Sequence, residues 1–262
     1  MNISVPPHYL GVWQRKQLES PAGVDNSSHV FWLQTSLLHA DIRIPANRLA
    51  YNDKQSWQDF SLEELKTLTS QQGFAGATSV IGDTCLWLRH IDYQPTKVGR
   101  DIGHMQFYGN HILETGIESS YSEIWERLPD SQGAQSALQF EEENNAHYPG
   151  SVQSGMLVTS SDYFIFVRNR ATALPTTTSL DSLVTTINPT RQQLIAWLDF
   201  EISFGRIELG NVPWEIQLST LPFRQRKSLF STSTGSAILQ AKTDYIQHEQ
   251  AGNGILTRRW FV

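Results

Sequence analysis

Pairs of turn-forming residues divide the first half of this chain into short segments. Gly82-Asp83 and Gly109-Asn110 are of the kind that joins two strands in a tight hairpin, and Ser119-Ser120 separates two further apolar segments in the same way. Residues 37–45 alternate apolar and polar side chains, as do residues 198–204. Alternation with a period of two is typical of strands that bury one face. These features predict a mainly β, antiparallel protein.

The segments predict eight strands in each half of the chain. In the first half they fall within residues 9–17, 29–36, 37–45, 74–81, 84–94, 102–108, 112–118 and 121–128. In the second half they fall within residues 138–143, 152–159, 162–168, 198–208, 214–221, 235–241, 245–250 and 254–262. Eight antiparallel strands are enough to close a barrel, so we expect two successive antiparallel β-barrels with a few short helices.

One helix is expected over residues 61–72. Ser61 and Glu64 form a capping box, in which each side chain accepts a hydrogen bond from the backbone N–H of the other. Gly73 suits the left-handed position that often ends a helix. We expect this helix to be a lid across the end of the first barrel.

A polar run, residues 130–136, predicts a linker between two domains, 1–129 and 130–262. The second domain carries an insertion rich in Thr and Ser, residues 171–197, with short helices expected after Ser179 and at Pro189. The sequences at residues 86–89 and 165–168 resemble each other, which favours an internal duplication.

Composition limits the cellular compartments and the classes of binding partner that we expect. The net charge of −6 and the lack of a basic stripe argue against nucleic acid as a partner. A single cysteine, Cys85, excludes an intramolecular disulfide. The N-terminal residues lack the pattern of a signal peptide, and no apolar stretch approaches the ~20 residues that a membrane helix needs. We therefore expect a cytoplasmic protein without a membrane partner.

Few single residues indicate a catalytic, cofactor-binding or metal-binding role. There is no nucleotide-binding or hydrolase motif and no zinc-type spacing, so neither a cofactor nor a metal is expected. His104 and His111 are more simply surface histidines than metal ligands, and Cys85 is more simply a core residue than a nucleophile. The acidic run 141–143 is more simply a solvated strand edge than a cation site.

The hairpin around Ser119-Ser120 carries the main candidate site. A two-residue turn there would place Glu114 opposite Trp125 and Gly116 opposite Glu123. One face of the hairpin then carries carboxylates and aromatic rings, and one face of strand 84–94 carries Trp87, Arg89 and Tyr93. These faces lie either in solvent or in the barrel lumen, where they would bind one small molecule. The candidate ligand-binding residues are Trp87, Arg89, Tyr93, Glu114, Glu123 and Trp125.

Three classes of function remain open from the residues. The first, which we favour, is a non-catalytic module that binds a small polar or acidic ligand in the first lumen. The second is an enzyme that uses Glu114 and Glu123 as an acid/base pair. The third is a scaffold that only binds a protein partner.

Several short motifs carry a resemblance to a known family. Gly11-Val12-Trp13 on the first strand is similar to the Gly-x-Trp signature of lipocalins and other calycins. Residues 73–76, 114–116 and 122–125, in this order, resemble a lipocalin-like family that includes a fungal casein-kinase interactor and bacterial relatives. The likeness covers about residues 9–128. It implies two successive lipocalin-like barrels, a protein partner, and no assigned catalytic residues.

Closure of the first barrel predicts one specific contact. First and last strands become neighbours in a closed barrel, so Trp13 should lie beside Arg127. The resemblance to lipocalins implies the same pairing, with the guanidinium stacked over the indole. The alternative is a simple core Trp13 and a solvated Arg127.

Overall fold

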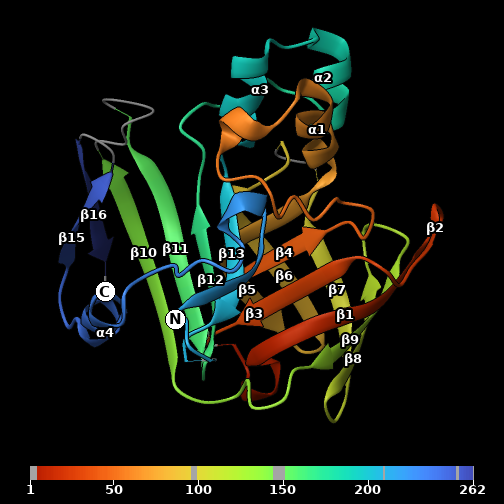
Figure 1. Cartoon of the computed structure of the whole chain (residues 1–262). Coiled ribbons are helices and arrows are strands. Elements are labelled where there is room, and N and C mark those ends of the chain that lie inside the picture. Colours follow the sequence, from red (N-terminus) through yellow and green to blue (C-terminus); the bar gives the residue numbers. More distant parts are fainter. Residues whose placement is uncertain (1–4, 96–98, 144–150, 209, 252–253, 262) are drawn as a thin grey trace.

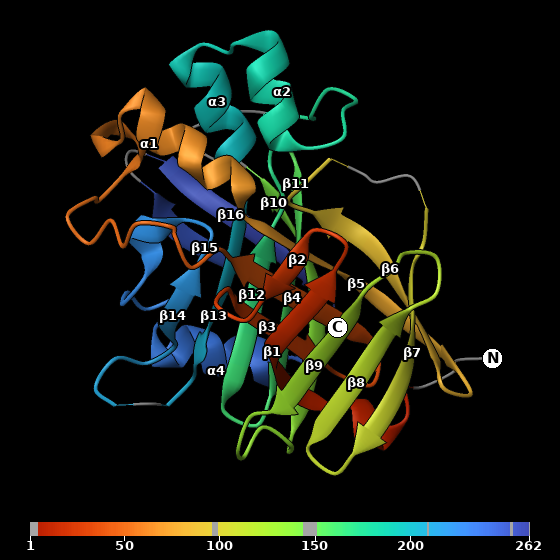
Figure 2. The ribbon, with the colours of Figure 1, turned by 90° about the vertical axis from the view of Figure 1, so that its right-hand side faces the viewer.

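The first half of the chain closes into a barrel. The computed structural model describes residues 5–95, 99–143, 151–208, 210–251 and 254–261. The first sheet is antiparallel, and β1 pairs both with β3 and with β9, so that eight strands close and the short β2 lies at the edge (Figures 1 and 2). Its strands are β1 (Gly11–Ser20), β2 (Gly23–Asp25), β3 (His29–Gln34), β4 (Leu38–Ile44), β5 (Gln72–Ile81), β6 (Thr84–Asp92), β7 (Asp101–Tyr108), β8 (His111–Gly116) and β9 (Ser122–Arg127).

The second half forms a seven-stranded antiparallel sheet, in the order β14-β13-β12-β11-β10-β16-β15. Its strands are β10 (Gln135–Glu143), β11 (Gln153–Ser160), β12 (Tyr163–Arg168), β13 (Glu201–Arg206), β14 (Glu215–Ser219), β15 (Tyr245–Ala251) and β16 (Gly254–Phe261). The mainly β fold with a barrel is therefore confirmed. Over the described residues, however, β14 and β15 do not pair with each other and form the two ends of the sheet, so closure is seen in the first half alone.

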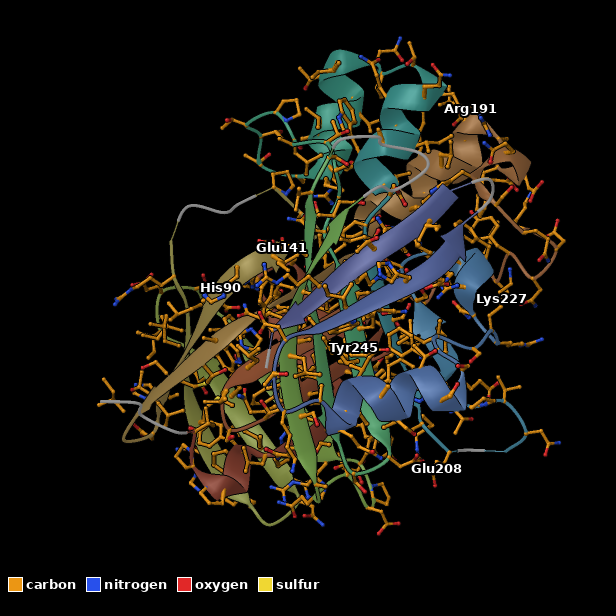
Figure 3. All side chains as sticks on the ribbon, turned by 90° about the vertical axis from the view of Figure 1, so that its left-hand side faces the viewer. His90, Glu141, Arg191, Glu208, Lys227 and Tyr245 are labelled. Atoms are coloured by element: carbon orange, nitrogen blue, oxygen red, sulfur yellow. The ribbon has the colours of Figure 1, made fainter. Side chains whose placement is uncertain are left out.

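The two sheets share one strand order. Without β7 and the short β2, the first sheet reads β6-β5-β4-β3-β1-β9-β8, which matches the second sheet strand for strand. The place of β7 in the chain is taken by helix α4 (Thr232–Gln240), which lies below β15 and β16 in Figure 3. The prediction of a strand over 235–241 was thus wrong. Gly235 packs so closely on Trp214 that a Cβ would lie 2.1 Å from the indole nitrogen. The common order supports the expected duplication, with one strand replaced by a helix.

The remaining helices gather at one end of the molecule, beside both sheets (Figure 1). They are α1 (Leu62–Thr67), α2 (Leu180–Ile187) and α3 (Arg191–Leu198). Short 3-10 segments are Pro7–Tyr9, Trp57–Asp59, Leu68–Ser70 and Pro222–Arg224. The capping box of Ser61 and Glu64 is present, and the helices expected after Ser179 and at Pro189 are α2 and α3. Because α3 extends to Leu198, the strand expected from that residue begins only at Glu201.

The lid prediction needs correction in two respects. Leu65 of α1 and the following Leu68 are buried in a cluster shared with the second half, so the helix caps the junction of the sheets. Gly73 does not end a helix. It lies in β5 with φ +150°, and a Cβ there would lie 2.5 Å both from the Asp41 carbonyl oxygen and from Ile202 Cδ1. Glycine at this position lets the second sheet approach the barrel wall.

That close approach decides which face of the barrel wall is inside. Ala40, Ile42 and Ile44 of β4 belong to the shared apolar cluster, together with residues of β11–β13. The alternate residues Asp41 and Arg43 therefore face the lumen. The apolar face of this strand packs against the second sheet, and the polar face lines the interior of the barrel.

The junction between the halves is ordered. β9 ends at Arg127 and β10 begins at Gln135, so the connecting segment, 128–134, lies two residues earlier than the linker expected over 130–136 and has the same length. Ser131 is buried, and its hydroxyl accepts a hydrogen bond from the Val12 N–H (3.1 Å) while its carbonyl accepts one from Ser160 (2.6 Å). The division into domains 1–129 and 130–262 stays a prediction. Across the described ranges, none of the helices has the length and apolarity to span a bilayer.

Candidate functional site

The floor of the barrel lumen is aromatic. Four indoles from four strands belong to one buried cluster: Trp13, Trp32, Trp87 and Trp125. Trp32 packs edge to face against two of the others, and its ring centroid lies 5.7 Å from that of Trp87 and 5.8 Å from that of Trp125. This arrangement suits the quadrupoles of aromatic rings and fixes the orientation of each indole.

The barrel closes at Trp13. Trp13 and Arg127 are paired residues of β1 and β9, and the guanidinium carbon lies 4.3 Å from the Trp13 ring centroid. Arg127 also donates to the His8 carbonyl (2.6 Å), and Trp13 donates to the Tyr9 carbonyl (2.7 Å). The geometry expected for the closing contact is present, and its energetic contribution stays a prediction.

Charged side chains line the lumen above the indoles. Arg15 donates to Glu123 (2.8 Å) and to Asp25 (2.7 Å), and both Arg15 and Glu123 are buried. Arg43 donates to Asp41 (2.6 Å) and lies 3.8 Å from Glu123. Ions removed from water are stable only when paired and hydrogen-bonded, and each of these two guanidiniums has a carboxylate partner.

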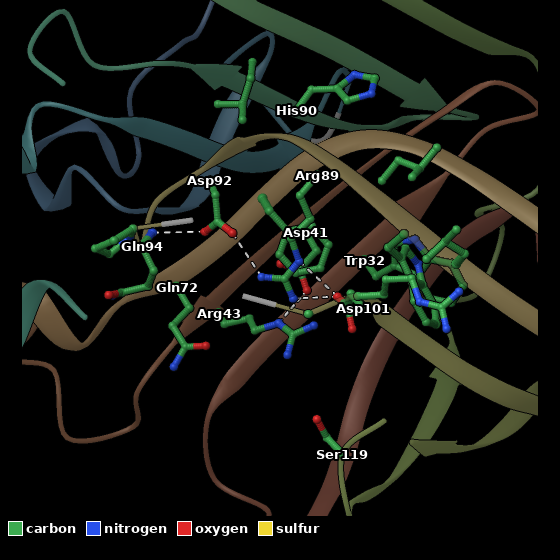
Figure 4. A pocket seen from close by; sticks show the side chains of 18 of the residues that line it. Trp32, Asp41, Arg43, Gln72, Arg89, His90, Asp92, Gln94, Asp101 and Ser119 are labelled. Atoms are coloured by element: carbon green, nitrogen blue, oxygen red, sulfur yellow. Dashed lines mark hydrogen bonds and ion pairs between the residues drawn. The ribbon is translucent and has the colours of Figure 1, made fainter. Parts of the chain in front are cut away.

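A second part of the network crosses from β6 to β7. Arg89 pairs with Asp92 (3.0 Å) and with Asp101 (2.5 Å), as Figure 4 shows. The Arg89 guanidinium also lies 3.7 Å from the Phe74 ring centroid, and that of Arg43 lies 5.3 Å from the same ring. Phe74 therefore positions both guanidiniums through cation–π contacts.

Glu114 and Glu123 lie directly opposite each other on β8 and β9. This register differs by two residues from the predicted one, because β8 ends at Gly116 and β9 begins only at Ser122. The turn is thus longer than Ser119-Ser120. A shift of two residues keeps each side chain on its face, so the expected polar face is intact.

The environment of Glu114 favours its neutral form. Its two oxygens accept hydrogen bonds from the Tyr121 hydroxyl (2.7 Å) and from Trp125 Nε1 (3.1 Å). Burial, followed by the charge of Glu123, raises the pKa of Glu114 well above its usual value. Burial also raises the pKa of Asp41, against the opposing effect of Arg43. Burial, with Arg89 and His90, lowers the pKa of His39 to about 3, so this lumen-side ring is neutral at pH 7.

These residues surround a cavity of about 1050 Å³. Its wall includes the indoles of Trp32, Trp87 and Trp125, and its mouth is bordered by residues 169–177 of the second half. Two buried polar atoms of the wall have no protein partner, Asp41 Oδ1 and Trp32 Nε1. The interior thus has room for a small molecule beside a buried acceptor and a buried donor that no protein group satisfies.

Five of the six predicted ligand residues line this cavity: Trp87, Arg89, Glu114, Glu123 and Trp125. Tyr93 does not. Its side chain is buried in the shared cluster, and its hydroxyl donates to the Leu68 carbonyl (2.9 Å). Gly76 pairs with Arg89 while Ala75 pairs with Ile91, so His90 is an extra residue in β6. A bulge of one residue exchanges the two faces of the strand beyond it, which turns Tyr93 outward.

Sequence reasoning missed several residues of the site, in particular Arg15, Trp32, Asp41, Arg43 and Asp101. The alternation in residues 37–45 contained the signal for Asp41 and Arg43. Alternation alone does not say which of the two faces lies inside the barrel, so these residues were not among the predicted ligand residues.

The other single residues that the sequence singled out lie away from the cavity. Cys85 is buried in the aromatic cluster, and burial raises the pKa of its thiol. His104 and His111 are exposed at different positions of β7 and β8. In the acidic run, Glu142 is buried and accepts a hydrogen bond from Arg258 (2.6 Å). Within the described ranges, no group of three or more His, Cys, Asp or Glu residues is placed to hold a metal ion.

Comparison with known proteins gives no relative. No protein-family model matches the chain, and no curated protein and no solved structure does so either.

Proposed function

We propose that the first barrel is a binding module that holds one small polar molecule in its lumen. The observation that carries this proposal is the cavity of about 1050 Å³, which is bordered by the closed barrel and by residues 169–177 and lined by both indoles and charged groups. Ligand sites in proteins are concave, of about 300–1,000 Å³, and combine apolar walls with a few placed polar groups. Of the polar or acidic ligands expected from the sequence, the polar class fits better, because Arg15, Arg43 and Arg89 are already paired with carboxylates.

A scaffold without a ligand is supported less well. A barrel that serves only as a surface has no need of buried ion pairs, and filling its lumen with apolar side chains would stabilise it at least as well. A protein partner, which the lipocalin-like resemblance implies, is compatible with a loaded or an empty lumen. The lipocalin-like assignment, with its closed eight-stranded order as support, and the cytoplasmic location remain part of this proposal.

Catalysis by Glu114 and Glu123 is a second candidate, favoured by one observation. The two carboxyl groups are opposed across β8 and β9, and the pKa of Glu114 is raised, as in a general acid. Both oxygens of Glu114 nevertheless accept hydrogen bonds from the protein. A positioned, neutral carboxyl group in a binding wall accounts for this arrangement without a reaction.

A ligand-observed NMR screen of small polar molecules tests the binding proposal. Gln72 lies exposed on the wall of the cavity, so Gln72→Trp should obstruct it and weaken the hits. Gln106 is exposed on β7 away from the cavity lining, which makes Gln106→Trp the matched control. We expect hits that Gln72→Trp weakens and Gln106→Trp leaves unchanged. A screen without hits, or hits that respond equally to both substitutions, would contradict the proposal.

A further inference from the structure

Carboxylates outnumber guanidiniums in the interior of the first barrel. Five carboxyl groups line the cavity, those of Asp41, Asp92, Asp101, Glu114 and Glu123. The guanidiniums that pair with them are those of Arg15, Arg43 and Arg89, and Arg15 has a further carboxylate partner in Asp25. With Glu114 neutral and Asp41 ionised, four carboxylates of the lining stand against these three guanidiniums, an excess of one negative charge.

The cations at the mouth do not reverse this excess. Arg100 is paired with Glu118, which neutralises it at the rim. Arg170 is directed to backbone carbonyls, including that of Trp197 (2.9 Å), and its guanidinium lies over the Phe200 ring at 4.6 Å. Its charge is thus held at the junction of the two halves.

Asp41 is the carboxylate placed to pair with a bound cation. Its side chain is 1% exposed, Oδ2 accepts from Arg43, and Oδ1 has no partner. A buried acceptor without a partner is unfavourable and is satisfied by a ligand donor or by water. Asp41 is paired with Trp32 on one side and with Phe74 on the other, so this acceptor lies between two aromatic side chains.

The aromatic wall favours the same class of ligand. Indole faces attract organic cations, and three indoles line the cavity. Phe74 already has two guanidiniums near its ring, which shows that this wall accepts cations. Trp32 Nε1 is a donor without a partner, so the ligand should also carry an oxygen acceptor.

We propose that the ligand of the first barrel is a small organic cation with an apolar or aromatic body and an oxygen acceptor. Its charged N–H group donates to Asp41 Oδ1, its body lies against the indoles, and its oxygen accepts from Trp32 Nε1. This inference rests on the proposed binding function and specifies its ligand class.

Three probes with one body and different charge test this class. Tyramine is the cation, 4-ethylphenol the neutral analogue and 3-(4-hydroxyphenyl)propionate the anion. In isothermal titration calorimetry at pH 7 we expect tyramine to bind at least about tenfold more tightly than the anion, with the neutral probe between them. If the anion or the neutral probe binds as tightly as tyramine, the lumen is a site but the ligand class is wrong. If none of the three binds, both the class and the binding function fail.

Asp41→Asn locates the cation. We expect this variant to weaken tyramine about tenfold or more and to leave 4-ethylphenol unchanged. Glu126→Gln is the control, because Glu126 lies on β9 beside the site but pairs outside the barrel with Lys16. An equal loss for both probes, or no loss, would exclude Asp41 as the cation's partner. Should Asp41→Asn fail to fold, the charge ranking on the unaltered protein still decides the ligand class.

Discussion

Substitution of Arg15 tests most directly whether the charged groups of the lumen are buried, because the next residue in the chain provides a matched control. Arg15 is 8% exposed and holds Glu123, which is buried. In Arg15→Met, the nearest remaining cation is Arg43 at 3.8 Å, and Glu114 lies directly opposite. Breaking one side of a buried ion pair costs about 3–5 kcal/mol, because an uncompensated charge stays behind.

Lys16 lies next to Arg15 on the outer face of the same strand. Its pair with Glu126 has a comparable length, 2.9 Å, but both side chains are more than 40% exposed. An exposed pair contributes about 0–1 kcal/mol, so Lys16→Met should change the free energy of unfolding little. The two substitutions remove the same charge from adjacent positions. The sites differ in burial and in their carboxylate partners, which are Glu123 and Asp25 for Arg15 and Glu126 for Lys16.

Urea unfolding, followed by tryptophan fluorescence and by circular dichroism, measures the free energy of unfolding of both variants. With a denaturant slope of about 3 kcal/mol/M, Arg15→Met should lower the midpoint by about 1 M or more. Replacing both partners, in Arg15→Met with Glu123→Leu, should recover most of the loss, since no buried charge is then left unpaired. An Arg15→Met variant within about 1 kcal/mol of Lys16→Met would refute the argument, because Glu123 would then be solvated and the lumen open to bulk water.

Two further substitutions test the closing contact and the neutral carboxyl group. In a double-mutant cycle of Trp13→Phe and Arg127→Met, urea unfolding should give a coupling of about 0.5–2 kcal/mol, and additive losses would show that the stacked geometry contributes nothing. Because the pKa of folded Glu114 is raised, its contribution to stability is present below the usual value of 4.5 and is lost as pH rises. Glu114→Gln, compared with the unaltered protein, should therefore gain stability progressively as the pH rises above 4.5. A difference that does not change with pH would mean that Glu114 is ionised in the folded protein.

The strands of the barrel could be predicted from the sequence because each carries its own signal. Alternation, two-residue turns and the capping box at Ser61 are local features, and they located every strand of the first half except the short β2. The exception among the regular elements of the second half is α4. It begins after an N-cap, Ser231, whose hydroxyl accepts a hydrogen bond from the Thr234 N–H, and its Gly235 packs against Trp214, a contact that no local pattern predicts.

The inside of the barrel could not be predicted, because it depends on a contact between the halves. The choice between the two faces of β4 is made where Ile202 packs over Gly73, about 130 residues later in the chain. The orientation of Tyr93 was predicted wrongly because His90 is a single bulge residue, and the sequence pattern does not indicate a bulge there. The face of the candidate residues on β8 and β9 was predicted correctly although the register was wrong. The error was two residues, and a shift by an even number keeps each side chain on its face.

Electron density in the first lumen of crystals saturated with tyramine is the most direct measurement. We predict density for one molecule against Trp32, Trp87 and Trp125, with its ammonium nitrogen about 3 Å from Asp41 Oδ1. A lumen that holds only ordered water, with tyramine absent or bound elsewhere, would contradict the conclusion that this barrel is a ligand-binding module.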